Sequence, residues 1–285
     1  MSGSAEWAFD WLRQKVLESN ELLWGSLPEA RNDYVARYMY DESYQRAAQF
    51  YFQLFGMTGT GGPVLDLAAG CGQYVFWCLK NGYDAYGIEP EPWKLDFIKE
   101  KIRRAGYPGD WQSRIVPGCG ESLPYEDNRF QYLNSDQTLE HVQDPDRVLK
   151  EMIRVTRPGG GIHIRCPDYL GTFEAHYRLP WLPLFPRPAA KLYLRLLGRP
   201  TLGLDTLRYV TKSRLHRAIR KIAGQSPGLS LAVTDVDRLQ FNLKLWRKGI
   251  PNWSILYLVY RNWRYGAGLF RTVSGVNIFI RVVTK

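Results

Sequence analysis

One segment constrains the fold of this chain more than any other. Residues 64–72 read VLDLAAGCG, so an apolar run ends in an acidic residue and closely spaced small residues. A helix-like stretch and a second apolar run follow, and the second run ends at Glu89. This is the layout of the first βαβ unit of a nucleotide-binding sheet, in which small residues let the backbone approach a ligand and the acidic residue binds ribose hydroxyls.

The details of the turn disfavour a dinucleotide. Pyrophosphate binding favours three glycines at the start of a helix, but Val75 occupies the third position and the bulky Phe76 and Trp77 follow. A carboxylate at Asp66 would repel a phosphate. It suits a cationic or zwitterionic ligand, such as the amino-acid end of S-adenosylmethionine.

The same turn resembles a known family. Residues 66–72 (DLAAGCG) are similar to the D-x-G/A-x-G-x-G motif of class I S-adenosylmethionine-dependent methyltransferases. Three later segments resemble the type 11 subgroup of that family, in the same order: 118–125 (GCGESLPY), 139–145 (LEHVQDP) and 149–160 (LKEMIRVTRPGG). The resemblance implies a methyltransferase that uses S-adenosylmethionine, and it says almost nothing about the acceptor.

The resemblance and the alternation of strands and helices predict an α/β fold with a Rossmann-like class I methyltransferase sheet. The sheet is expected to be mostly parallel with its last strand antiparallel. We expect four regions: an N-terminal helical cap over 1–57, a cofactor-binding core over 63–167, a basic helical insertion or acceptor lid over 168–228, and a C-terminal part over 229–285 that completes the sheet and adds lid helices.

Individual elements are predicted after the core. Residues 161–166 are expected to form strand 5, and Thr211 is expected to cap a helix that Gly224 ends. Residues 229–236 and the β-branched run 276–283 are predicted as the last two strands.

The resemblance also assigns cofactor-binding residues. Small residues of the turn allow close approach to the cofactor, Asp66 orients the turn and meets the ammonium group, and Glu89 accepts from the ribose hydroxyls. Cys119 stands where the family usually has Asp to bind the adenine amino group, and a thiol is a poor acceptor. Adenine is therefore expected to be held by backbone groups and packing. The expected set is Asp66, Ala68, Gly70, Gly72, Glu89, Cys119, Gly120 and Glu121.

Methyl transfer from a sulfonium needs in-line positioning and, for a hydroxyl acceptor, a base. His141, His176 and Asp136 are the candidate catalytic residues, because they follow strands 4 and 5, where ligands of such sheets bind. His141 equally suits a capping or packing role. No metal site is expected: some relatives bind a divalent metal through E-x-x-E-H, and the neutral Gln137 stands at the first Glu of that pattern.

Charge is distributed unevenly between the two halves. Residues 1–164 contain 17 Lys and Arg and 23 Asp and Glu, which gives a net charge of −6. Residues 165–285 contain 21 Lys and Arg and only 5 Asp and Glu, which gives a net charge of +16. This asymmetry suggests an anionic acceptor or surface. In segment 186–199, basic residues at 187, 191, 195 and 199 form one helical face, and Ala189, Leu192, Tyr193 and Leu196 form another. Such a helix either lies in a membrane interface or packs as a lid with a basic edge.

The favoured function is O-methylation of a glycan, lipid-linked sugar or other amphiphilic acceptor by an enzyme of polysaccharide or glycolipid biosynthesis. One alternative is an RNA or small-metabolite methyltransferase, although nucleic acid is a less favoured partner than a glycan or lipid-linked acceptor. The other is a non-catalytic regulatory subunit that binds the cofactor. The sequence has neither a signal-like N-terminus nor an apolar run long enough to span a bilayer, and its four cysteines lack metal-ligand spacing. We therefore expect free thiols and a cytoplasmic protein with peripheral contact to the inner face of an anionic membrane.

Overall fold

The computed structural model describes residues 62–247 and 275–285, together with short N-terminal pieces at 10–15, 18, 22–25, 52–53 and 56; the side chains of 244–247 are left out. Most of the expected N-terminal cap lies outside the described residues. So do the expected C-terminal lid helices after residue 247, including the aromatic run 253–260.

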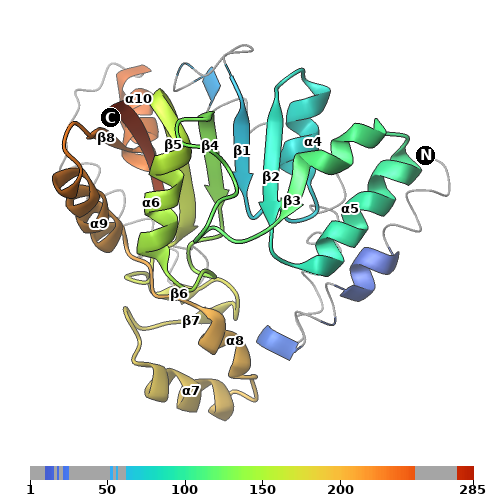
Figure 1. The fold of residues 1–285 in the computed structure, drawn as a ribbon. Coiled ribbons are helices and arrows are strands. Elements are labelled where there is room, and N and C mark those ends of the chain that lie inside the picture. Colours follow the sequence, from blue (N-terminus) through green and yellow to red (C-terminus); the bar gives the residue numbers. More distant parts are fainter. Residues whose placement is uncertain are drawn as a thin grey trace.

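A seven-stranded sheet organises the molecule, in the order β3-β2-β1-β4-β5-β9-β8 (Figure 1). The first five strands are parallel, and β9 lies antiparallel between β5 and β8, which confirms the predicted sheet. Strand 5 is longer than expected because it begins at Thr156. The strands are β1 (Val64–Leu67), β2 (Ala85–Glu89), β3 (Ile115–Pro117), β4 (Phe130–Asp136), β5 (Thr156–Pro167), β8 (Ser230–Asp235) and β9 (Gly275–Thr284).

Helices cover both faces of the sheet, as a mostly parallel sheet requires. One face packs against α6 (Pro145–Val155) and α9 (Lys212–Gln225). The other packs against α4 (Gln73–Lys80), α5 (Pro92–Ala105) and α10 (Val236–Arg247). The 3-10 helix η3 (Gly109–Arg114) leads into β3.

The helix after Thr211 forms for the reasons that its sequence indicates. The Thr211 hydroxyl accepts from the Arg214 backbone N–H at 3.1 Å, which satisfies a free donor of the first turn. The predicted apolar stripe is buried against the sheet and α6, and it consists of Leu215, Ala218, Ile219 and Ile222. This helix thus belongs to the layered core, although it lies within the region expected to form the insertion.

Residues 168–210 form a separate layer at the carboxyl edge of the parallel strands, and we call this segment the lid (Figure 1). It contains a small hairpin of β6 (Phe173–Glu174) and β7 (Leu179–Pro180), then α7 (Arg187–Leu196) and α8 (Leu202–Thr206). The lid has its own apolar cluster, which is completed by Trp24 from the N-terminal region.

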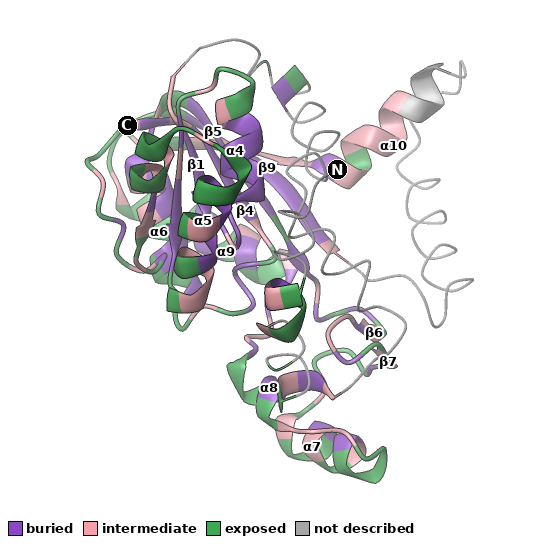
Figure 2. Cartoon of the chain, turned by 90° about the vertical axis from the view of Figure 1, so that its right-hand side faces the viewer, coloured by how far each residue is buried: buried purple, intermediate pink, exposed green. Residues whose placement is uncertain are grey.

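The faces of α7 differ from the sequence expectation. Its buried residues are Ala190 and Leu194, whereas Leu192 and Leu196 are 58% and 78% exposed. The expected basic face is partly turned inward, because Arg187 donates to backbone carbonyls of α8 and its C-cap, and Lys191 pairs with Asp205. Figure 2 shows exposed residues along α7, far from the sheet.

Gly161 provides a test of the β5–β9 packing. A Cβ at this position would overlap the ring of Phe279. We expect Gly161→Ala to lower the free energy of unfolding by about 1–3 kcal/mol through overpacking. The control is Gly224→Ala in α9, where a Cβ meets no atom within 4 Å, and which we expect to raise stability by roughly 0.4–1 kcal/mol. Urea unfolding measures both, and equal stability of the two variants would contradict the described packing.

Candidate active site

The turn after β1 has the backbone of a ligand-binding loop. Ala68, Gly70 and Gly72 all have positive φ, at 59°, 59° and 80°. A left-handed conformation is strained for Ala and easy for Gly, so a non-glycine residue held there marks a site where the surrounding structure fixes the backbone. A Cβ at Gly72 would lie 2.8 Å from the Phe76 ring, which explains why the turn needs glycine there.

Glu89 lies directly against this turn. Its side chain is 1% exposed, and one carboxylate oxygen accepts from the Gly70 backbone N–H at 2.7 Å while the other accepts from Glu91 N–H at 3.0 Å. Lys94 Nζ is 3.5 Å away. Burial raises the pKa of Glu89, although Lys94 and the two N–H groups oppose the shift. The end of β2 thus lies against the turn after β1, within the βαβ unit that the sequence predicts.

Asp66 begins a line of buried polar groups across the sheet. It accepts from Asn134 Nδ2 at 2.7 Å, and Asn134 Oδ1 lies 3.4 Å from His163 Nδ1. Asn277 donates to Asp237 at 2.9 Å, so its oxygen is left to accept from His163 Nε2, also at 2.9 Å. The line therefore links the turn to α10. Burial raises the pKa of Asp66 well above its ordinary range and lowers that of His163 to about 4.

The loop after β3 places its three predicted residues differently. Cys119 is exposed, and Gly120 is buried against Val148 and Leu67. The Glu121 carboxylate accepts from the N–H groups of Gln143 and Asp144, at 2.8 and 3.3 Å. The side chain of Glu121 therefore holds the loop before α6, which leaves its backbone for the predicted contact with adenine.

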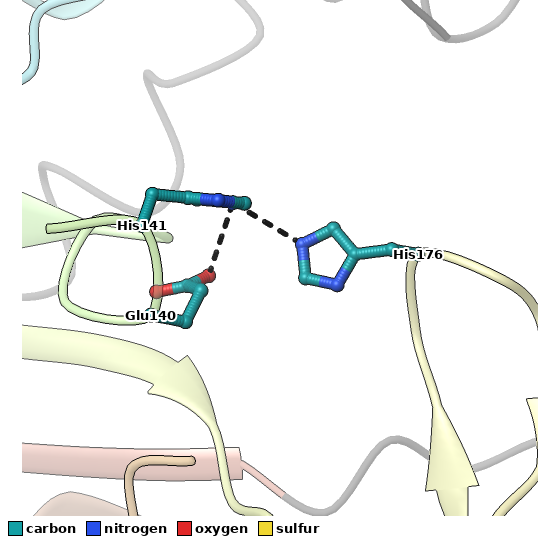
Figure 3. Close-up of side chains that lie close together, drawn as sticks. All are labelled: Glu140, His141 and His176. Carbon is teal, nitrogen blue, oxygen red and sulfur yellow. Dashed lines mark hydrogen bonds and ion pairs between the residues drawn. The ribbon is translucent and has the colours of Figure 1, made fainter. Parts of the chain in front are cut away.

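A second group of side chains lies under the lid. The turn after β4 supplies Glu140 and His141, and the lid supplies His176 (Figure 3). The two Nε2 atoms of His141 and His176 are 3.2 Å apart, and His141 Nε2 is 4.0 Å from Glu140 Oε1. We call these three residues the edge cluster. A hydrogen bond of 3.2 Å from Thr138 to the Leu67 carbonyl ties the turn of the cluster to the start of the cofactor loop.

The lid side of the edge cluster is held rigidly. Glu174 Oε1 lies 2.8 Å from His176 Nδ1, and the Tyr177 backbone N–H donates to the other oxygen at 2.7 Å. Trp24 stacks on the His176 ring with centroids 4.7 Å apart. The lid also reaches the core through its backbone, because Arg208 N–H donates to the Glu140 carbonyl at 2.7 Å.

The pKa values of the three edge-cluster residues shift in different directions. Complete burial raises the pKa of Glu140 to about 8. Burial and the neighbouring His176 lower the pKa of His141. For His176, burial lowers the pKa, but the hydrogen bond and charge of Glu174 outweigh it and the net shift is upward. Such opposed shifts in adjacent groups are typical of sites that bind or move charge.

Asp136, the third candidate base, is placed differently. Both of its oxygens accept from the Arg165 guanidinium, at 2.7 and 2.5 Å. The structure thus brings His141 and His176 together and gives Asp136 an ion pair of its own. Sequence reasoning missed Glu174, for which the only signal was its position two residues before His176.

The comparisons with known proteins agree with this geometry. Residues 65–164 match the family model of a methyltransferase domain. These residues span the cofactor turn, Glu89, the loop after β3 and the turn of the edge cluster. Residues 65–164 therefore form a methyltransferase domain.

The similar curated proteins are methyltransferases. An uncharacterized methyltransferase of Mycobacterium sp. (strain JLS) is 34% identical over 119 residues, which are 42% of this chain and 44% of that protein. The demethylmenaquinone methyltransferase of Bacillus pumilus (strain SAFR-032) is 32% identical over 145 residues, 47% of this chain and 59% of that protein. The chain thus spans about half the length of the curated relatives that it matches.

A solved structure has a similar fold. It is a protein from Galdieria sulphuraria assigned as a sarcosine dimethylglycine methyltransferase, with a TM-score of 0.51 and 16% identity over 99% of both chains. Among the helices that the structure describes in this chain, none has the length and apolar content needed to cross a bilayer.

The described residues fit S-adenosylmethionine. Two buried carboxylates, Asp66 and Glu89, flank a turn whose glycines leave room for a ligand. Carboxylates are suited to the cationic amino and sulfonium groups and to hydroxyl donors, whereas a phosphate would be repelled. We infer that Asp66 faces the amino-acid end and Glu89 the ribose, with Gly120 and Glu121 beside adenine.

The ribose assignment predicts a loss of affinity in Glu89→Gln. The amide retains the shape but replaces one of two acceptors by a donor, so one ribose hydroxyl loses its partner. We expect binding to weaken by about 1–3 kcal/mol in calorimetry with S-adenosylmethionine. Glu91→Gln, at a side chain that is 47% exposed, serves as the control and should bind as the wild type does. Unchanged affinity in Glu89→Gln would remove Glu89 from the ribose site.

Proposed function

We propose that this protein transfers the methyl group of S-adenosylmethionine to an oxygen of an amphiphilic acceptor, a glycan or lipid-linked sugar presented near an anionic membrane surface. The observation that carries the proposal is the position of the edge cluster. It lies at the carboxyl edge of the sheet, tied to the cofactor turn on one side and covered by the lid on the other. Ligands of such sheets bind at this edge.

The chemistry asks little of the protein beyond placement. The sulfonium already activates the methyl group, so the core needs to hold the cofactor and the lid needs to hold the acceptor in line with it. A hydroxyl acceptor must also lose its proton as the new bond forms. His141 is the member of the edge cluster that is open to an acceptor, with 39% of its side chain exposed.

His176 supports His141 in this proposal. Glu174 and Trp24 fix the His176 ring so that its Nε2 points at His141 Nε2 (Figure 3). A proton that His141 takes from the acceptor has a neighbouring imidazole, backed by a carboxylate, to share it. This arrangement of a base, a second imidazole and an orienting carboxylate resembles the logic of known proton-transfer triads.

The amphiphilic acceptor is suggested by the outer surface of the lid. Seven large apolar side chains of the lid are at least 47% exposed, and they are Leu170, Leu182, Leu184, Leu192, Leu196, Leu197 and Leu202. Arg195 lies among them on α7 and is exposed. An exposed apolar surface with basic residues is typical of a helix in a membrane interface.

Three other functions remain as outcomes of the tests. Methylation of RNA would show as label in the RNA fraction and as binding that falls steeply with salt, and a small-metabolite acceptor as label in the water-soluble fraction. A non-catalytic cofactor-binding subunit would bind S-adenosylmethionine and transfer no methyl group. None of these alternatives uses the exposed leucines of the lid.

Transfer of labelled methyl from S-adenosylmethionine into fractionated lipid, glycan and RNA extracts tests the function directly. We expect label in the lipid-linked or glycan fraction, and a turnover about 100- to 10,000-fold lower in His141→Ala with cofactor affinity intact. His216→Ala, in α9 and away from the edge cluster, is the matched histidine control and should retain turnover. Full activity of His141→Ala would contradict the base assignment, and label in RNA alone would contradict the acceptor.

The membrane contact is tested by flotation with vesicles of phosphatidylcholine and phosphatidylglycerol. We expect the wild type to float and the triple variant Leu192→Ser, Arg195→Glu, Leu196→Ser to remain at the bottom, because apolar burial and charge attraction are both lost. Val283→Ser, at a 46% exposed residue near the end of β9 and outside the lid, is the control and should float. A wild type that never floats would exclude the contact.

A further inference from the structure

We propose that the edge cluster is a divalent metal site in which Glu140, His141 and His176 bind a zinc-like cation. The starting observation is Glu140. Its side chain is fully buried, and among the described residues neither of its carboxylate oxygens has a hydrogen-bond partner. A buried carboxylate with no partner is costly, so a structure that retains one indicates a missing ligand.

A shared proton does not account for this cluster. One proton between the two facing Nε2 atoms satisfies His141 and His176, but it leaves both oxygens of Glu140 without a donor. A divalent cation satisfies all three groups at once. The three side chains each offer one ligand atom, and these atoms lie within 4.8 Å of one another.

The separation of the two imidazole nitrogens fits a tetrahedral ion, whereas Glu140 Oε1 lies 4.0 Å from His141 Nε2 and would have to move closer when a cation binds. Zinc binds imidazole nitrogen at about 2.0–2.1 Å, which separates two tetrahedral ligands by roughly 3.3 Å. The Nε2 atoms of His141 and His176 are 3.2 Å apart before any cation is present. Two imidazoles and one carboxylate favour zinc or a similar transition metal over magnesium or calcium, which prefer oxygen ligands alone.

The surroundings of His176 support the same inference. The Glu174 carboxylate faces His176 Nδ1 at 2.8 Å, so that nitrogen carries a proton and Nε2 is left with its lone pair toward the cluster. A carboxylate behind a metal-binding imidazole is a recurrent feature of metal sites, where it fixes the tautomer and raises ligand basicity. The Tyr177 N–H and Trp24 hold the carboxylate and the ring in place.

Three protein ligands leave one position of a tetrahedral shell open, as in catalytic zinc sites. Resting on the proposed function, we infer that the acceptor oxygen would take this position. The cation would lower the pKa of the acceptor hydroxyl, its proton would leave to water as the new bond to the methyl group forms, and His141 would then act as a metal ligand in place of the base. The expectation of no metal site depended on Gln137. His176 supplies the third ligand from the lid instead, 35 residues further along the chain.

Zinc titration of the full chain tests the site without any acceptor. The chain is stripped with a chelator, dialysed and titrated with Zn²⁺ against a chromophoric competitor, and Co²⁺ reports tetrahedral geometry by its visible absorption. We expect one equivalent per chain. His176→Ala and the conservative Glu140→Gln should bind at least about 100-fold more weakly, and Glu174→Gln about 10- to 100-fold more weakly.

His216→Ala is the matched control and should bind as the wild type does. A wild type that binds no stoichiometric metal, or a folded His176→Ala and Glu140→Gln that bind as tightly as the wild type, would overturn the site. The outcome is separable from that of the proposed function. Absence of stoichiometric binding together with methyl transfer overturns the metal site and leaves the function standing, whereas stoichiometric zinc with no transfer to any fraction does the reverse. Full methyl transfer by the metal-free chain overturns the contact between the cation and the acceptor.

Discussion

The contact between His141 and His176 is the interaction on which the rest of this account depends. His141 belongs to the core and His176 to the lid, and their facing nitrogens are 3.2 Å apart. The fold brings the two segments to the same edge, because the chain leaves β5 at the carboxyl edge of the sheet and the turn after the parallel β4 lies at that same edge. The backbone hydrogen bond from Arg208 to Glu140 fixes the second side of the junction. Core and lid therefore share a single site.

Three buried carboxylates lie near the same edge, although the burial of a carboxylate does not by itself stabilise the fold. Asp66, Glu89 and Glu140 are all buried, and burial raises the pKa of each. Removing a carboxylate from water is costly unless it gains partners. Glu89 has the N–H groups of the cofactor turn and Lys94, and Asp66 has Asn134. Each is also placed to meet a cationic or hydroxyl-bearing ligand, which is consistent with a site built for S-adenosylmethionine and its acceptor.

Much of this arrangement could be predicted from the sequence, because local patterns determine it. The turn between β1 and α4, the cap at Thr211 and the β-branched run of β9 each carry a short-range signal, and each forms as predicted. The faces of α7 could not be predicted. Periodicity shows which residues share a face, but only the position of α8 decides that Arg187 and Lys191 turn inward.

The edge cluster was harder to predict for a similar reason. Both histidines were candidates on their own, yet nothing in the spacing of residues 141 and 176 indicates that their rings meet. The contact depends on the path of the β6–β7 hairpin and on Trp24, which is distant in sequence. Glu174 orients His176 through that same hairpin.

The most direct test of a shared core–lid site is a double-mutant cycle of His141→Ala and His176→Ala, measured as kcat/KM with the extract fraction that accepts label. Residues that act as one unit give strongly non-additive losses. The account predicts that the double variant loses about as much activity as the more impaired single variant. Losses that multiply, so that the two free-energy changes add, would show that core and lid histidines act independently and would contradict it.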